Sequence, residues 1–148
     1  MFKTGTYVVV NKEKYLGKTN PHYRSMYEMR MMSYLDLNKN VLHWKYENIA
    51  IPYFYPIDGQ VHNYIIDFWC EIINRDNVIQ QYLVEVKPSK ECKVPSSPKR
   101  NTARSRSRYV AEATTFVKNQ CKWKAAELYC QQKGWKFIKI TEKDLFNR

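Results

Sequence analysis

The sequence has 148 residues, 44% hydrophobic and 15% aromatic, which is enough apolar material for one globular domain over residues 1–148 and too much for a disordered chain. No stretch approaches the roughly 20 apolar residues of a membrane span, and residues 1–20 lack the apolar segment of a signal peptide, so we expect a soluble protein with no membrane partner. Lysine and arginine number 25 against 14 aspartate and glutamate, and this net charge of +11 favours contact with a polyanion, nucleic acid before membrane.

A short strand and a helix are predicted at the start of the chain. Residues 7–10 (YVVV) favour a strand. Ser25 and Glu28 have the spacing of a capping box, so a helix is expected to begin at Ser25. It should end near Leu37, where an Asn-Lys-Asn run interrupts the apolar pattern.

Three strands are predicted next, joined by turns. Residues 40–55 are rich in β-forming residues and indicate one strand that can bulge near Glu47. Asp58-Gly59 is a hairpin-turn signal, and residues 61–73 and 78–87 form the next two strands around a polar turn. Such a meander is antiparallel.

The last third of the chain is predicted to hold a basic loop, a helix and a strand. Residues 88–108 contain seven basic residues and one acidic residue among serines and prolines, which favours a flexible loop. Apolar residues then recur at helical spacing from Tyr109 to the helix-ending Gly134, followed by a strand over 135–140 and a short final helix. A right-handed crossover would make this strand parallel to its neighbour, so we expect an α/β fold of αβββαβ order, a mixed sheet flanked by helices.

Two acids stand out because they lie in strongly apolar strands. Asp67 is set in YIIDFW, and Glu85 and Lys87 are set in YLVEVK. The alternation of side chains along a strand places Glu85 and Lys87 on one face. A carboxylate is costly to bury unless it is paired or bound to a metal.

The hairpin register predicts that the two acids lie opposite each other. If the turn is centred on Asp76, partner residues have numbers that add to 152, and Asp67 and Glu85 are such a pair. Their Cβ atoms would then be about 5 Å apart, which is unfavourable unless a cation lies between the carboxylates. Oxygen ligands of this kind suit Mg²⁺ or Mn²⁺. Lys87 on the same face could stabilise charge on a phosphate or orient the attacking water.

Glu28 is a candidate third acid. It shares a helix face with Met31, Met32 and Leu35, where a glutamate is unexpected, and it would point toward Asp67 if that face packs on the sheet. Simpler readings stay open. Glu28 could serve only the cap at Ser25, Asp67 could accept backbone N–H groups, and Glu85 with Lys87 could be a solvated strand face.

This ordered set of residues resembles the PD-(D/E)xK nuclease superfamily. The resemblance implies that Asp67, Glu85 and the carbonyl of Val86 bind a divalent metal, Mg²⁺ or Mn²⁺. It also implies that Lys87 is catalytic and that Glu28 completes the acidic site. Ile66 stands where the family has a proline, and that proline is not a metal ligand.

Further motifs make the resemblance closer over about residues 20–145. They are similar to those of the head completion nucleases of T-even-like tailed phages and, more distantly, to the endonuclease subunit of heteromeric transposases. The resemblance implies a nuclease acting on packaged double-stranded DNA before the tail joins the head. It would work in the host cytoplasm during phage assembly or in the virion, with phage head or neck proteins as possible partners. The motifs are YRSxxExR at 23–30, IPY at 51–53, PIDG at 56–59, HxYxxDF at 62–68, YLVEVKP at 82–88, NQxKWxAA at 119–126 and GW at 134–135.

Several other residues have a structural and a functional reading. His62 and four tryptophans (Trp44, Trp69, Trp123 and Trp135) are expected to be structural rather than catalytic or base-stacking. Asn119, Gln120 and Lys122 are expected to be solvent-exposed polar residues, although phosphate contact by Lys122 is an alternative. Arg104, Arg106 and Arg108 would line up on one side of an extended arm and contact DNA phosphates, or belong to a loop ordered by a partner.

Two rival functions remain open at this point. A non-catalytic DNA-binding virion assembly protein on a nuclease fold would retain DNA without cutting it. A transposase-like or junction-resolving endonuclease would depend on a dimer or a partner subunit for its activity.

Overall fold

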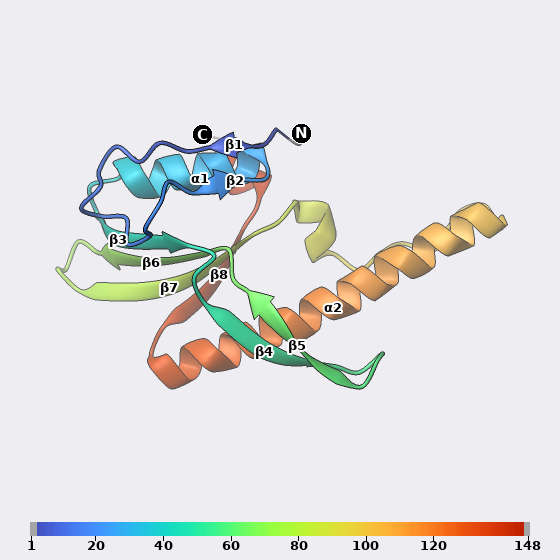
Figure 1. The fold of residues 1–148 in the computed structure, drawn as a ribbon. Coiled ribbons are helices and arrows are strands. Elements are labelled where there is room, and N and C mark those ends of the chain that lie inside the picture. The colour runs from blue at the N-terminus through green and yellow to red at the C-terminus, as the bar shows by residue number, and fades with distance from the viewer. Residues whose placement is uncertain (1–2, 147–148) are drawn as a thin grey trace.

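The computed structural model describes residues 3–146, which form a mixed sheet with helices on both of its faces (Figure 1). Each element follows from its neighbours along the chain. The helices are α1 (Met26–Leu37), η1 (Ser89–Cys92, a single 3-10 turn), α2 (Ala103–Lys133) and α3 (Glu142–Phe146). The strands are β1 (Gly5–Thr6), β2 (His22–Tyr23), β3 (Val41–Tyr46), β4 (Ala50–Tyr55), β5 (Gln60–Ile65), β6 (Phe68–Ile73), β7 (Ile79–Val86) and β8 (Lys136–Ile140).

The central sheet has the strand order β3-β6-β7-β8. β3, β6 and β7 are antiparallel neighbours, and β8 runs parallel to β7 after the long crossover through α2. With α1 before the sheet and α2 before β8, this confirms the expected α/β fold of αβββαβ order.

The two faces of the sheet bury two separate apolar clusters, because side chains alternate along the strands. α1 and the N-terminal segment cover one face, where Phe68 and Val84 point. The C-terminal half of α2 and the β4–β5 hairpin lie together against the other face, where Trp69 and Leu83 point (Figure 1). Trp44 and Trp123 are buried in these clusters, as expected for core residues.

Both ends of the two long helices carry the predicted signals. Ser25 caps α1, with its Oγ accepting a hydrogen bond from the backbone N–H of Glu28 at 3.2 Å. Gly134 ends α2 in the left-handed conformation, with φ 72°. A glycine adopts that conformation without the steric cost that a side chain adds.

The first two predicted strands of the meander are each divided in two. The expected irregularity at Glu47 is present, with φ 48°, and it separates β3 from β4. The partner strand breaks at the same level, since the N–H of Glu47 donates to the carbonyl of Asp67 and the N–H of Ile66 donates to the carbonyl of Ile49. The prediction of continuous strands over 40–55 and 61–73 was therefore wrong. The outer halves form a separate hairpin, β4–β5.

The prediction of a strand over residues 7–10 was also wrong, and a buried acid explains why. Asp36 on α1 accepts hydrogen bonds from the backbone N–H groups of Val10 and Asn11 and from the Tyr7 hydroxyl. These donors are thereby taken from any sheet partner. Among the described residues before β2, the only strand is the two-residue β1.

The basic segment predicted as a loop over 88–108 is helical at both ends. η1 follows directly after Pro88, and α2 begins at Ala103 rather than near Tyr109. Thr102 is the reason for the early start, because its side chain caps the helix by accepting from the N–H of Ser105 at 3.1 Å. Arginine is also a good helix former. The N-terminal half of α2 extends away from the rest of the fold (Figure 1).

Candidate active site

The three residues of the predicted catalytic motif lie at one end of the central sheet. β6 pairs with β7 in the predicted register, from Phe68 opposite Val84 to Ile73 opposite Ile79. Asp67 immediately precedes β6, and Glu85 lies one residue before the end of β7. The register prediction is confirmed, with Asp67 just outside the paired segment.

The Asp67 carboxylate is anchored to the opposite strand. Its Oδ2 accepts a hydrogen bond from the backbone N–H of Val86 at 2.8 Å. Burial and the negative charge of Glu85 raise the pKa of Asp67 well above its ordinary value, against the lowering effect of the Val86 hydrogen bond. The open reading that Asp67 is satisfied by a backbone N–H is thus true for one oxygen. The Glu85 charge nevertheless still acts on the carboxylate.

Glu85 is a buried carboxylate, 3% exposed, so it is not part of a solvated strand face. Its Oε2 accepts a hydrogen bond from the hydroxyl of Tyr64, and its Oε1 lies 3.6 Å from the Nζ of Lys87. Burial raises the pKa of Glu85, while the hydrogen bond from Tyr64 and the charge of Lys87 lower it. Two buried acids therefore share one small region with a lysine.

Tyr64 is a site residue to which sequence reasoning assigned no role. It lies on β5, it is 4% exposed, and the bend between β5 and β6 brings its hydroxyl to Glu85. Glu85 in turn raises the pKa of Tyr64, after burial. The only sequence signal was its place in the HxYxxDF motif, three residues before Asp67.

Lys122 of α2 adds a second positive charge on this side of the sheet. Its Nζ lies 5.4 Å from the centre of the Tyr64 ring, which places it beside the Tyr64–Glu85 pair. Burial and the charge of Lys87 lower the pKa of Lys122, whereas the charge of Glu85 raises it. Lys122 is half-buried rather than a freely solvated lysine.

Glu28 approaches from the α1 side and is held in a network of its own. Its Oε1 accepts hydrogen bonds from the backbone N–H of Arg24 at 2.7 Å and from the hydroxyl of Tyr46 at 3.0 Å. The side chain is buried, and its charge contributes to the raised pKa of Asp67. Capping and electrostatic contact with the site therefore coexist in Glu28.

The donor set suits a hard divalent cation. Asp67 and Glu85 provide carboxylate oxygens in a buried setting that disfavours their charged forms, and a cation would relieve that cost. Within residues 3–146, no group of three or more Asp, Glu, His or Cys side chains is close enough to hold an ion. Glu28 is thus not gathered into one ligand group with Asp67 and Glu85, and its part in metal binding stays a prediction.

The predicted DNA-contacting arginines are exposed on a helix rather than on an extended arm. Arg104 and Arg108 are four residues apart in α2 and share a face, whereas Arg106 points to the other side. Arg106 donates from its Nη1 to the Oδ1 of Asn101 at 2.6 Å. The prediction that all three line up on one side was wrong, because the helical period replaces the extended one.

Two other expectations can be compared with the structure. His62 stacks on Tyr53 and lies 2.6 Å from the Oδ2 of Asp58, inside the β4–β5 hairpin, in keeping with a structural role. Asn119 was expected to be solvent-exposed, but it is 3% exposed. This expectation was wrong because α2 packs closely against its neighbours at that turn. Within the described residues, no helix is long and apolar enough to cross a membrane.

Comparison with known proteins agrees with this geometry. The chain is 34% identical over 146 residues to the head completion nuclease of Enterobacteria phage T4, covering 98% of this chain and 95% of that protein. Residues 38–142, which run from the end of α1 to the start of α3, match the family described as TnsA-like endonuclease N terminal. The resemblance drawn from the motifs is confirmed. The chain belongs to the TnsA-like endonuclease N-terminal family.

Proposed function

We propose that this chain is a DNA nuclease that depends on Mg²⁺ or Mn²⁺ and hydrolyses phosphodiester bonds. The observation that carries the proposal is the anchoring of Asp67 to the N–H of Val86, which holds one acid beside the Glu85-Val86-Lys87 triplet. Family membership supports a DNA-cleaving hydrolase. The donor chemistry of the two acids supports the choice of metal.

Asp67, Glu85 and the carbonyl of Val86 are the proposed metal ligands. A divalent cation bound there would supply a water of lowered pKa and would shield the charge of the phosphate. Glu28 is proposed to support the same site from the α1 side, through a second metal or the water. Tyr64 holds the carboxylate of Glu85 in place through its hydroxyl.

Lys87 and Lys122 are proposed to act on the phosphate. Lys87 is part of the acidic site, with its ammonium group 3.6 Å from Glu85, so it can stabilise the charge that develops on the scissile phosphate. Lys122 is farther out on α2 and beside Tyr64, where it can hold a phosphate of the bound strand.

The exposed arginines at the start of α2 are proposed to extend the DNA contact. Arg104 and Arg108 project from the part of α2 that reaches beyond the rest of the fold (Figure 1). Their contacts would be with phosphates and independent of sequence.

We propose head completion in a phage as the setting, because the T4 protein with which this chain shares 34% identity is named for that step. The substrate would be double-stranded DNA in the packaged head, before head and tail join. The chain would then act in the host cytoplasm during assembly and could stay in the virion. Phage head or neck proteins are the proposed partners.

The test is DNA digestion with Mg²⁺ by wild type, Asp67→Asn and Lys87→Met. The Asp67→Asn variant would keep an acceptor for the Val86 N–H but not the charge, so we expect at least about a hundredfold less cleavage with an unchanged fold. Glu71→Gln and Lys136→Met are matched controls, since Glu71 pairs with His43 and Lys136 is exposed on β8. Cleavage by Asp67→Asn at the wild-type rate would refute the assignment.

The same assay separates the rival functions. Wild type that binds DNA but shows no metal-dependent cleavage would be a non-catalytic assembly protein. Faster cleavage of four-way junctions than of linear ends or supercoils would instead indicate a junction-resolving enzyme.

A further inference from the structure

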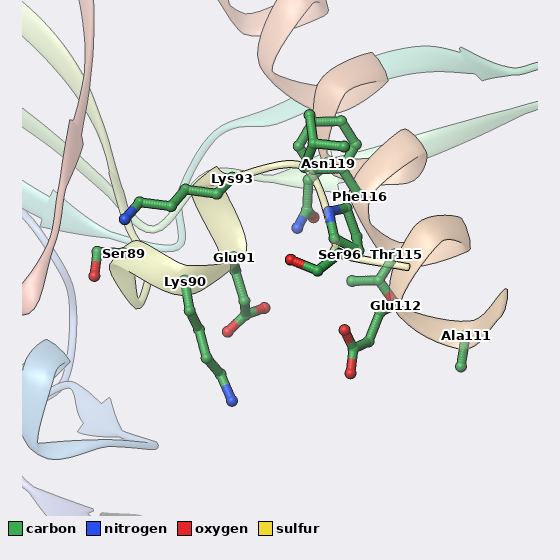
Figure 2. Close-up of a pocket in the computed structure, with 12 residues that line it drawn as sticks. Ser89, Lys90, Glu91, Lys93, Ser96, Ala111, Glu112, Thr115, Phe116 and Asn119 are labelled. Atoms are coloured by element: carbon green, nitrogen blue, oxygen red, sulfur yellow. The ribbon is translucent and has the colours of Figure 1, made fainter. Parts of the chain in front are cut away.

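A cavity of ≈ 670 Å³ lies beside the proposed active site and has no part in the chemistry described so far. One wall is the segment 89–96, which includes η1, and the other is the middle of α2 (Figure 2). Its volume is in the range of pockets that hold small organic groups. The cavity therefore has room for a ligand.

The α2 wall presents a buried amide without a partner. Asn119 is 3% exposed, and within the described residues its Nδ2 has no hydrogen-bond acceptor. Asn119 lines the cavity, and Figure 2 shows it next to Phe116. Buried amide groups are nearly always hydrogen-bonded, so this one points to an acceptor that a ligand supplies.

The rest of the lining suits a flat and uncharged ligand. Phe116 is half-buried and offers an aromatic ring, and Val94 and Pro95 add apolar surface. Four charges surround the cavity, Lys90 and Lys93 against Glu91 and Glu112, so it carries no net charge in a chain of +11. The two carboxylates oppose the entry of a phosphate, while the lysines can hold one outside.

The cavity is close to the site along both walls. Ser89 follows Lys87 by two residues, and Asn119 lies one helical turn before Lys122, which contacts Tyr64. A group bound in the cavity would therefore be part of the same DNA strand that crosses the acidic site.

We propose that this cavity receives an unpaired nucleobase of the DNA, next to the bond that is cut. Phe116 stacks on the base, and the Asn119 amide hydrogen-bonds to its edge. Stacking on aromatic side chains and amide contacts to base edges are the usual means of recognising unstacked bases. This inference rests on the proposed nuclease function. It specifies a preferred substrate, DNA with a strand end or an unpaired base.

Fluorescence of 2-aminopurine tests the inference without cleavage. The probe is a duplex with a short single-stranded overhang that contains 2-aminopurine, mixed with wild-type protein in EDTA. We expect emission to fall on binding, because the base stacks on Phe116. Phe116→Leu should abolish this change and weaken binding of the overhang about tenfold, with blunt duplex bound as before.

Asn119→Leu tests the amide separately. It should lose about tenfold in affinity for the overhang and keep or raise the melting temperature, because no hydrogen bond is lost from the protein itself. Gln131→Leu, an exposed position at the far end of α2, is the matched control and should change neither. A lower melting temperature with unchanged affinity would mean that Asn119 is structural, and the inference would fall.

Digestion of the same DNA with Mg²⁺ distinguishes the two proposals. Wild type that cuts DNA but leaves 2-aminopurine emission unchanged would overturn the base-binding cavity alone. Wild type that changes the emission but cuts no DNA would overturn the nuclease function while supporting the cavity.

Discussion

Asp67 accepts a hydrogen bond from the backbone N–H of Val86, the residue between Glu85 and Lys87. A side chain from the start of one strand is thereby fixed to the backbone at the end of the next. Because Val86 is itself paired with Ile140 of β8, the anchor is part of the sheet and not of a loop. The arrangement of the two acids is therefore set before any metal or DNA arrives, which is the preorganisation that electrostatic catalysis requires.

Tyr64→Phe is expected to weaken metal binding and cleavage about 10- to 100-fold, the usual effect of losing a partner of a metal ligand. The hydroxyl of Tyr64 donates to Glu85 and lowers the pKa of that carboxyl, so its removal also shifts the pH profile of cleavage to higher pH. Tyr53→Phe is the matched control, a buried tyrosine of β4 that stacks on His62. Equal cleavage by wild type and Tyr64→Phe would remove Tyr64 from the site.

Metal-free protein is expected to lose stability as pH rises. The pKa values of Asp67 and Glu85 are raised in the fold above ordinary values of 3.8 and 4.5, so the unfolded chain releases these protons first. The free energy of unfolding therefore falls from about pH 4 upward until the folded carboxyls also ionise. Thermal denaturation in EDTA from about pH 4 to about pH 8 measures this, with the Asp67→Asn, Glu85→Gln double variant as control.

The same measurement with metal gives the opposite trend. Mg²⁺ or Mn²⁺ binds the deprotonated acids, so stabilisation grows with pH, by about 2.7 kcal/mol at a metal concentration one hundred times Kd. The double variant should not respond to metal. Parallel pH curves for both proteins, with and without metal, would contradict the prediction.

Glu28 has two roles that substitutions can separate. Ser25→Ala removes the cap of α1 and should cost about 1 kcal/mol, or about 2–4 °C in melting temperature, with cleavage retained. Glu28→Gln keeps an oxygen that accepts from Arg24 and Tyr46 but removes the charge near Asp67. We expect it to reduce cleavage about tenfold or more with little change in melting temperature. A large loss of stability with normal cleavage would reduce Glu28 to a capping residue.

The arginines of α2 should contribute unequally to DNA binding. Replacing both Arg104 and Arg108 by glutamine should lower the slope of log affinity against log salt by about 1.8. Arg106→Gln should change it less, since Arg106 is already engaged by Asn101. Fluorescence anisotropy with double-stranded DNA from about 50 to 200 mM salt gives these slopes. Equal effects of all three would favour an extended arm in the complex.

Local patterns in the sequence were enough to predict the elements and the motif. Ser25 and Gly134 mark helix ends because capping depends on a few neighbouring residues. The register of β6 with β7 follows from the position of one short turn, and period-two alternation places Glu85 and Lys87 on one face. These features involve residues that are close in the chain, and so the residues themselves determine them.

The tertiary structure decided which distant side chains join the motif. The bend at Glu47 and Asp67 turns β4–β5 out of the main sheet and brings Tyr64 to Glu85, while the course of α2 brings Lys122 to Tyr64 and buries Asn119. Each of these contacts joins separate elements, and its geometry depends on how sheet and helices pack. The sequence determined by itself that Asp67, Glu85 and Lys87 form a nuclease motif. Only packing determined that a tyrosine, a second lysine and a neighbouring cavity surround them, because contacts between distant residues leave no periodic or capping signal in the chain.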